Sequence, residues 1–460
     1  MHLADLTRRE FLRRAGVLGV NGVAAPWAMN LAVMSAAAAQ TAAPGDYKAI
    51  VCLFLYGGND YANTVVPYDD VNYTAYQSLR STIATPRDHL AATALAPDIA
   101  LPEARQFALA PQLARLKGLF DAGNLGVLLN IGTLVQPTTK AQYTAKNVPL
   151  PPKLFSHNDQ QSVWQASSPE GATSGWGGRI GDLFLNANAS ATFTCVSVTG
   201  NAVFMSGRSA NQYQLSSSGS VRLRAAAQPL FGSRACSDTL RALVTAPRPH
   251  LIEDEYARIT RRSIDADVLL DAALAAQPAL VTAFDTDSDL GRQLQMVARM
   301  IQARAALGTR RQVFFVSLGG FDNHDFLLDQ HPGLLAQIDS ALAAFHAATV
   351  ELGVSSSVTA FTASDFGRTL TSNGDGSDHG WGSHHVVLGG AVRGRRFYGT
   401  APVVASNGPD DVGQGRLVPT QSVDQFAATL GTWFGVSPSD LPLVVPNIVN
   451  YTQRDLGFFA

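Results

Sequence analysis

Three short apolar runs in this sequence each end at a cluster of polar side chains. The runs are Ala49–Tyr56, Val313–Leu318 and Val358–Ala363, and the groups that follow them are Asp60, Asp322 with His324, and Asp365. Short runs rich in β-branched and aromatic residues, bounded by Gly, Asn or Asp, predict β-strands. Ligands of open α/β sheets sit beyond the carboxyl ends of parallel strands. The pattern therefore predicts a site at one edge of a mostly parallel sheet.

A glycine-rich segment after the third run adds histidines to this set. It contains Asp378, His379, His384 and His385, and six of the ten histidines in the chain lie between positions 324 and 385. Carboxylates and imidazoles gathered at strand ends are the ligands that a divalent cation requires. Single motifs have plainer interpretations, since Asp60 also suits an Asx-turn and Asp365 a helix N-cap. Taken together, the cluster predicts a metal site.

Two residues are candidates for direct chemistry. Ser156 opens a segment that resembles a helix start, where a hydroxyl lies near the positive end of the helix and a developing oxyanion or phosphoryl group is stabilised. A capping serine without chemistry explains the same motif. Arg368 follows Asp365 by three residues, and its guanidinium offers a bidentate fork to an anionic substrate.

The rest of the chain predicts a layered α/β protein. Strands are expected at 48–56, 125–131, 192–198, 311–318, 357–362 and 386–389, and helices at 111–122, 290–307 and 332–352. This alternation favours a mostly parallel sheet covered on both faces. Residues 200–285 predict an inserted cap, with helices at 251–262 and 264–275, and residues 132–153 predict a surface loop.

The first forty residues have the pattern of an export signal. Arg8 and Arg9 form a twin-arginine motif, and an apolar segment follows that ends in the small residues Ala36–Ala39. We expect residues 1–39 to be a twin-arginine signal peptide and the mature protein to be periplasmic or secreted. The polar residues within the apolar segment make it a poor permanent span, so no stable membrane insertion is expected.

Composition and cysteine content narrow the function further. The net charge is -2 and no dense Lys/Arg run follows the signal, which argues against a nucleic-acid partner. The three cysteines are too few for a disulfide scaffold or a zinc knuckle. Cys52 suits a small core residue, whereas a disulfide between Cys195 and Cys236 is open from the sequence alone.

These motifs occur together and in a fixed order. They are the twin-arginine start, the Gly-Gly-Asn-Asp60 block, Ser-His157 with Asp-Gln-Gln161 and Gly-Trp176, Gly-Gly-Phe-Asp-Asn-His324, Ser-Asp-Phe-Gly-Arg-Thr369, and Asp-His-Gly-Trp-Gly with His385. Over about residues 46–460 the set resembles a large family of exported bacterial proteins of uncharacterised function. That family is often described as sulfatase-like and distantly related to the alkaline phosphatase superfamily.

The resemblance implies an alkaline-phosphatase-like three-layer α/β/α fold with one or two divalent metals, commonly zinc, calcium, magnesium or manganese. It implies Ser156 as the nucleophile and, as metal ligands, Asp60, Asp322, His324, Asp365 and His379 or His385. The chain departs from the phosphatases at Phe366, which stands where they have a ligand histidine, and it lacks the Cys/Ser-x-Pro-x-Arg signature of sulfatases.

The sequence thus predicts an exported metal-dependent hydrolase of phosphate or sulfate esters that acts on an anionic small-molecule or polymer ester. The alternative is a non-catalytic exported binding or assembly protein that retains the fold. The density of His and Asp at strand ends favours the enzyme, while the missing ligand histidine favours the alternative.

Overall fold

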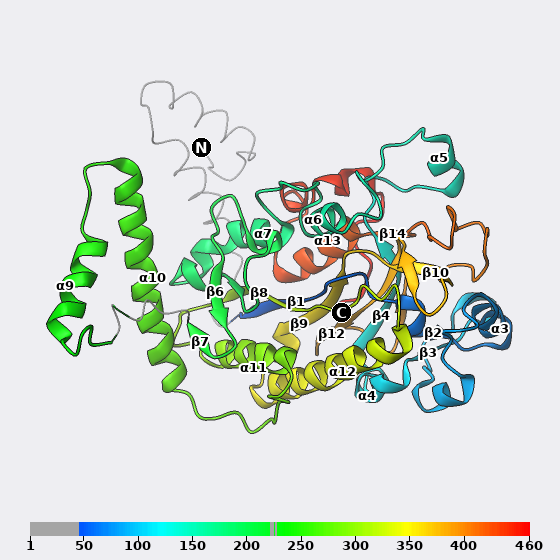
Figure 1. Ribbon diagram of the computed structural model, residues 1–460, viewed down its shortest axis with the longest axis horizontal. Coiled ribbons are helices and arrows are strands. Elements are labelled where there is room, and N and C mark those ends of the chain that lie inside the picture. Colours follow the sequence, from blue (N-terminus) through cyan, green and yellow to red (C-terminus); the bar gives the residue numbers. More distant parts are fainter. Residues whose placement is uncertain (1–45, 221–224, 226–227) are drawn as a thin grey trace, which may run out of the picture.

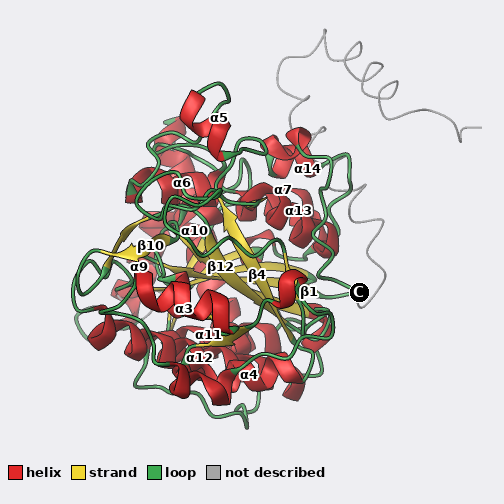
Figure 2. Ribbon diagram, turned by 90° about the vertical axis from the view of Figure 1, so that its right-hand side faces the viewer, coloured by secondary structure: helices red, strands yellow, loops and turns green. Residues whose placement is uncertain are grey.

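The structure is a computed structural model that describes residues 46–220, 225 and 228–460. The twin-arginine segment, residues 1–39, lies outside the described residues. The chain forms a mixed α/β structure in which helices cover both faces of one central sheet, as Figure 2 shows from the side. This confirms the predicted mixed α/β class with a largely parallel sheet.

Within the described residues, the central sheet has ten strands in the order β13-β4-β12-β9-β1-β8-β5-β6-β7, with β14 also paired to β4. The strands are β1 (Lys48–Leu55), β4 (Leu125–Gly132), β5 (Cys195–Ser197), β6 (Tyr213–Ser216), β7 (Gly219–Ser220), β8 (Arg311–Leu318), β9 (Val358–Ser364), β12 (Ser383–Leu388), β13 (Phe397–Tyr398) and β14 (Gln421–Ser422). Small two-stranded sheets join β2 (Val65–Pro67) to β3 (Phe107–Leu109) and β10 (Arg368–Ser372) to β11 (Ser377–His379). All six predicted strands are present.

Strand direction decides which residues reach which edge of the sheet. β1 runs parallel to both β8 and β9, so the carboxyl ends of these three strands lie at the same edge. β12 is antiparallel to both of its neighbours, β4 and β9. Its first residue therefore lies at that same edge, and each later residue lies deeper in the sheet.

The alternation of side chains along β1 builds a core on each face. Ala49, Val51 and Leu53 pack in one apolar cluster, while Ile50 and Phe54 pack in another on the opposite face. All five are fully buried. A strand buried on both faces reads as a continuous apolar run because neither face is left to water.

The α-helices are α3 (Asp70–Leu79), α4 (Ala114–Asp121), α5 (Lys140–Ala145), α6 (His157–Ala166), α7 (Trp176–Phe184), α9 (Arg234–Thr245), α10 (Leu251–Ala275), α11 (Asp289–Gln302), α12 (Leu327–Glu351), α13 (Val423–Phe434) and α14 (Leu441–Val444). Helices α4, α11 and α12 cover one face of the sheet, and α6, α7 and α13 cover the other (Figure 2). The predicted helices at 111–122, 290–307 and 332–352 correspond to α4, α11 and α12.

The structure differs from the sequence-based expectations in two places and decides one question that the sequence leaves open. The two helices predicted at 251–262 and 264–275 form one continuous helix, α10, because Ser263 does not interrupt it. The segment 132–153 contains the short helix α5, which begins at a capping box on Thr139. Cys195 is buried and Cys236 is exposed, and both are free thiols rather than a disulfide.

One helix meets the length and composition of a membrane span. In the described part of the chain this helix is α12, whose 18-residue window has a mean hydropathy of 1.2. Half of that window is buried inside the protein. Its apolar side chains, Leu335, Leu342 and Phe345 among them, belong to the core cluster on one face of the sheet, and a core helix of a soluble protein passes the same test.

Candidate metal centre

The loops that follow β1, β8 and β9 meet at one edge of the sheet. Gly57 follows β1 with φ of 114°, and a Cβ there would lie 2.4 Å from the backbone nitrogen of Asp322, which follows β8. The Gly57 N–H donates to the carboxylate of Asp365, which follows β9. Only glycine permits this close approach, so the sequence positions the two carboxylates through the absence of a side chain at position 57.

Three side chains from distant parts of the chain converge at this edge. His157 Nε2 lies 3.3 Å from Asp322 Oδ2, and His379 Nε2 lies 3.2 Å from Asp322 Oδ1. These three residues each offer one ligand atom, and the three atoms lie within 4.8 Å of one another. His157 is the first residue of α6, and His379 is the last residue of β11. The set is a candidate metal centre.

His324 adds a third imidazole to this group. Its Nε2 lies 3.1 Å from Asp322 Oδ1 and 2.9 Å from His379 Nε2. The centre thus gathers three imidazole nitrogens around one carboxylate. Ligand atoms bound tetrahedrally at 2.0–2.1 Å lie about 3.3 Å apart, so the atoms of His157, Asp322 and His379, all within 4.8 Å of one another, can surround one small cation, with His324 beside them.

The opposite nitrogen of each imidazole is held by an acceptor. Nδ1 of His157 contacts Asp365 Oδ2 at 2.7 Å, Nδ1 of His379 contacts the Phe155 carbonyl at 2.7 Å, and Nδ1 of His324 contacts Asp378 Oδ1 at 3.0 Å. Carboxylates and carbonyls only accept, so each Nδ1 carries the proton. In the neutral rings the three Nε2 lone pairs then face Asp322, which is the arrangement that second-shell partners impose on metal-binding histidines.

A buried polar atom without a partner supports the same interpretation. Within the described residues, His157 Nε2 and Asp365 Oδ1 are buried and have no hydrogen-bond partner. A buried polar atom without a partner costs about 1–3 kcal/mol, so such atoms need an explanation. An ion at the centre would account for His157 Nε2, since that atom faces Asp322. The residues present therefore fit a metal ion.

The backbone at Phe155 is strained, and its carbonyl serves the centre. Phe155 has φ of 74°, in the left-handed region that a bulky side chain rarely adopts. Its carbonyl accepts the hydrogen bond from His379 Nδ1. Strained backbone costs about 1–3 kcal/mol and tends to occur at functional sites. The conformation of Phe155 thus orients an imidazole of the centre.

The surroundings of the centre favour the metal-binding forms of Asp322 and His379. Burial opposes ionisation of Asp322, but the hydrogen bond and charge of Arg368 outweigh it and hold the pKa of Asp322 below its usual range. Burial lowers the pKa of His379, which keeps its ring neutral at neutral pH. The hydrogen bond to Asp365 raises the pKa of His157, which favours its protonated form, so a metal ion at this ring competes with a proton. An anionic carboxylate and a neutral imidazole are the forms that bind a metal.

The structure places Asp60 outside this centre. Asp60 is buried beside Arg80, whose Nη2 lies 2.5 Å from Asp60 Oδ2. The same carboxylate accepts from Ser377 Oγ at 2.7 Å and from the Asn63 N–H at 3.0 Å. Burial opposes ionisation, yet Arg80 lowers the pKa of Asp60. The guanidinium therefore supplies the positive charge that the sequence-based prediction assigned to a metal.

His385 also lies away from the centre. It is the third residue of β12, and because this strand is antiparallel, the position lies inside the sheet. Its ring packs edge-on against Trp164 at 5.9 Å, and burial lowers its pKa to about 3. The neighbouring His384 accepts from the Asn130 N–H at 3.0 Å. Asp365 does reach the centre, but as the partner of His157.

The two residues predicted for direct chemistry lie beside the centre in unexpected environments. Ser156 is the N-cap of α6, and its hydroxyl donates to Asp159 Oδ2 at 3.0 Å. Arg368 is almost completely buried, and it donates to Asp322 Oδ1, to the Gly57 carbonyl and to the Ser377 carbonyl. The guanidinium of Arg368 is thus engaged in hydrogen bonds within the protein, and it orients Asp322 instead of facing solvent.

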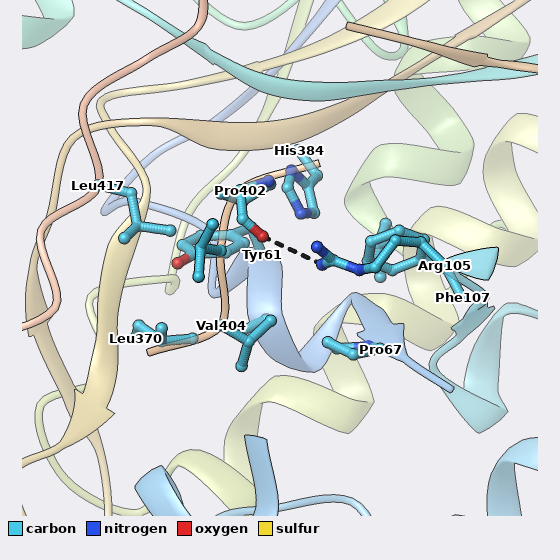
Figure 3. Close-up of a pocket in the computed structure, with 12 residues that line it drawn as sticks. Tyr61, Pro67, Arg105, Phe107, Leu370, His384, Pro402, Val404 and Leu417 are labelled. Atoms are coloured by element: carbon cyan, nitrogen blue, oxygen red, sulfur yellow. Dashed lines mark hydrogen bonds between the residues drawn. The ribbon is translucent and has the colours of Figure 1, made fainter. Parts of the chain in front are cut away.

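Two small cavities lie apart from the centre, since none of the residues that line them belongs to it. Figure 3 shows one cavity, lined by Tyr61, Phe107 and His384, where Arg105 donates to the Pro402 carbonyl. Its volume is about 10 Å³, and a neighbouring cavity measures about 20 Å³. Such volumes hold about one water molecule each. A substrate of the metal centre would therefore bind from its open side, where Asp322 is half-exposed.

His157 is not identified as a candidate ligand from the sequence. The motif Ser156-His157 was interpreted through its serine, although a histidine at the first turn of a helix can project toward the same edge as the strand ends. The indication of this role in the sequence is a histidine that stands at a predicted helix start, directly after a loop. Its pairing with Asp365, 208 residues away, is a tertiary contact that no local pattern encodes.

Comparison with known proteins gives a family but no established activity. No curated protein matches this sequence. A solved structure described as "Crystal structure of Ps i-CgsB in complex with k-i-k-neocarrahexaose" is similar at 9% identity and a TM-score of 0.35, covering 86% of this chain and 74% of that chain. A similarity this low carries no argument. Residues 47–442 match the family described as "Protein of unknown function (DUF1501)", and because this match spans most of the sequence, the chain belongs to that family.

Proposed function

We propose that this protein is an exported, metal-dependent hydrolase of phosphate or sulfate esters with an alkaline-phosphatase-like fold. The observation that carries the proposal is the convergence of three imidazole Nε2 atoms on Asp322, with each Nδ1 held by an acceptor. A bound divalent ion would polarise an ester oxygen and lower the pKa of the attacking nucleophile. Its ligands would be His157, Asp322, His324 and His379.

The ligand set favours particular metals. Imidazole nitrogens suit zinc and other transition metals, whereas calcium and magnesium prefer sites made of oxygen. Three imidazoles with one carboxylate therefore favour zinc, or manganese after it, over calcium or magnesium. Phe366 supports a single ion, since its ring packs 4.9 Å from the His157 ring and 4.7 Å from the His379 ring. It leaves the Asp365 loop without a further ligand histidine.

Arg416 is better placed than Arg368 to bind the anionic group of a substrate. Its Nε donates to the His379 carbonyl at 3.0 Å, and its guanidinium lies 4.5 Å from the ring centroid of Phe155. Both partners belong to the surroundings of the centre. Its two terminal nitrogens have no hydrogen bond or ion pair with the described residues, and the side chain is only partly buried. A free planar fork of this kind suits phosphate or sulfate oxygens.

Asp365→Asn should weaken metal binding by about 10–100-fold, because the change replaces the charged acceptor that fixes the tautomer of His157 with a neutral amide, which has only one acceptor oxygen. Titration of the metal-free protein with zinc, followed by calorimetry, measures this loss. Asp182→Asn is a matched control, since Asp182 also accepts three hydrogen bonds but takes them from the backbone of residues 208–210. Equal affinities of Asp365→Asn and wild type would contradict the assigned role.

Metal-loaded wild type should hydrolyse at least one member of a panel of phosphate monoesters, phosphate diesters and sulfate esters. If Ser156 is the nucleophile, Ser156→Ala should abolish turnover and leave metal content and melting unchanged, because a nucleophile acts in the transition state. Ser233→Ala, which removes the capping hydroxyl of α9, is the matched control. Turnover that survives Ser156→Ala would assign the attack to water or to another hydroxyl.

The alternative function is a non-catalytic exported binding or assembly protein. Two observations favour it: the hydroxyl of Ser156 is engaged by Asp159, and the fork of Arg368 is engaged inside the protein. Metal-loaded protein that turns over no member of the ester panel would make this alternative the leading one. Metal binding by itself is expected under either function.

Export is part of the proposal and has its own test. Changing both Arg8→Lys and Arg9→Lys should leave the precursor in the cytoplasm, because the twin-arginine pathway reads the paired guanidinium groups. Fractionation of cells followed by immunoblotting measures the distribution. Changing Arg13→Lys and Arg14→Lys is the matched control, since it keeps the motif at positions 8 and 9. Unchanged export of the first variant would exclude this pathway.

A further inference from the structure

Exposed apolar side chains are concentrated on one part of the molecule. Eight of the seventeen large hydrophobic residues that are exposed in the described chain lie between positions 231 and 269. This segment contains α9 and α10, which form a helical arm that extends away from the central sheet (Figure 1). Isolated exposed apolar residues are ordinary, but a contiguous group of them marks an interaction surface.

Three exposed residues in the N-terminal half of α10 form one stripe along the helix. Ile252, Tyr256 and Ile259 are spaced by four and three residues, so they lie on the same face. Their exposed fractions are 73%, 69% and 50%. In this half of the helix Ala257, which points to another side, is buried, and the face of the stripe becomes buried only about five turns after Ile252, at Leu270. The stripe is therefore an apolar helix face without a partner in the described chain.

The charged residues beside the stripe are ordered so that the helix complements an antiparallel copy of itself. Acidic residues precede the centre of the stripe at 253–255, and basic residues follow it at 258, 261 and 262. On one flank, Glu255 and Arg262 form an ion pair 3.1 Å long, with both side chains about half-exposed. A second copy of this helix in antiparallel orientation would bring each Glu255 beside the Arg262 of the other copy.

We propose that the stripe on α10 is a homodimer interface, in which two arms pack antiparallel about a two-fold axis near residue 258. Such an isologous contact pairs Tyr256 of each copy with Ile259 of the other. It also exchanges the Glu255–Arg262 pair within one chain for two equivalent pairs between chains. The apolar stripe supplies the attraction, and the charges fix the antiparallel register.

The charged residues of the arm favour a second copy of this protein, rather than a membrane surface, as the partner of the stripe. Residues 231–275 carry six basic and seven acidic side chains. An anionic lipid surface attracts helices whose polar face is rich in Lys and Arg, so this mixed face does not suit it. A contact limited to about three helical turns is smaller than a standard interface of about 1,200–2,000 Å², so we expect a dissociation constant on the order of micromolar.

Sedimentation velocity over a concentration series of the purified protein tests the interface. Wild type should show a monomer–dimer equilibrium, and Tyr256→Asp should weaken the dimer at least about tenfold, because the two-fold axis introduces the buried charge twice. Val281→Asp is the matched control, since Val281 is also exposed but lies outside the arm. Circular dichroism shows whether each variant keeps its helices.

A charge exchange tests the register. Glu255→Arg alone and Arg262→Glu alone should each weaken the dimer, and the double variant should recover it, because exchanging both charges again places opposite charges across the contact. A wild type that stays monomeric at its highest soluble concentration would overturn the proposal. So would Tyr256→Asp dimerising as wild type does, a double variant that fails to recover the dimer, or binding to anionic vesicles without self-association.

Discussion

Arg80→Met should lower the free energy of unfolding by about 3–5 kcal/mol, which is the usual loss when one partner of a buried ion pair is removed. The side chains of Arg80 and Asp60 are almost completely buried, so the change would leave the Asp60 carboxylate without its countercharge. Arg80 also donates to the carbonyls of Thr369 and Leu370. It thus ties the loop after β1 to β10, which belongs to the C-terminal half of the chain. Urea unfolding measures the loss.

The matched control for this prediction is Arg87→Met. Arg87 pairs with Asp70, and both side chains are well exposed, so its loss should change stability by no more than about 1 kcal/mol. Combining Arg80→Met with Asp60→Leu should recover part of the stability, because no charge is then buried alone. An Arg80→Met variant as stable as the Arg87→Met variant would show that the pair does not support the fold.

The sequence carries enough information for the sheet and for the edge where the centre lies. The strands β1, β8 and β9 are continuous apolar runs because both of their faces are covered, and their ends are marked by Gly and Asp. Parallel strands bring such ends together, so Asp322 and Asp365 could be placed at one edge. His324 and His379 could be placed there as well, since they flank strands at that same edge.

The positions of His385 and Asp60 could not be predicted in the same way. His385 follows His379 by six residues, and only the antiparallel direction of β12 carries it into the core. The apolar pattern of a strand does not show whether the strand runs parallel or antiparallel to its neighbours. The sequence alone therefore does not show that His379 reaches the centre and His385 does not. Asp60 depends on Arg80, which lies twenty residues further along the chain and is an ordinary basic residue in the sequence. Its burial beside Asp60 is a property of the folded protein.

His157 shows a different limit of sequence reasoning. As the first residue of α6, it faces the centre only because α6 begins at the edge where β9 ends. A local pattern identifies the helix start, but it does not say which loop the helix start will meet. The Phe155 carbonyl is still less predictable, since it depends on the left-handed conformation of that residue. The candidate ligands at strand ends are thus predictable from the sequence, whereas the candidate ligand and the acceptor at the helix start are not.

Removal of the metal should lower the melting temperature. The proposed ligands come from α6, from the loop after β8 and from β11, so a bound ion would connect segments up to 222 residues apart, from His157 to His379. An ion that binds the native but not the unfolded state stabilises the protein by about 4 kcal/mol at a thousandfold excess over its dissociation constant. We therefore expect dialysis against a chelator to shift the thermal transition downward and readdition of zinc to restore it.

His157→Ala separates this effect from any damage by the chelator itself. If the ion is held as proposed, the variant should melt at the temperature of the chelated wild type, and the chelator should change it no further, because both treatments remove the same linkage. His89→Ala, which removes an exposed histidine from another part of the molecule, should respond to the chelator as wild type does. Elemental analysis of each sample relates the shift to metal content. A wild type that contains stoichiometric metal yet melts identically after complete removal of it would show that the ion does not hold these segments together.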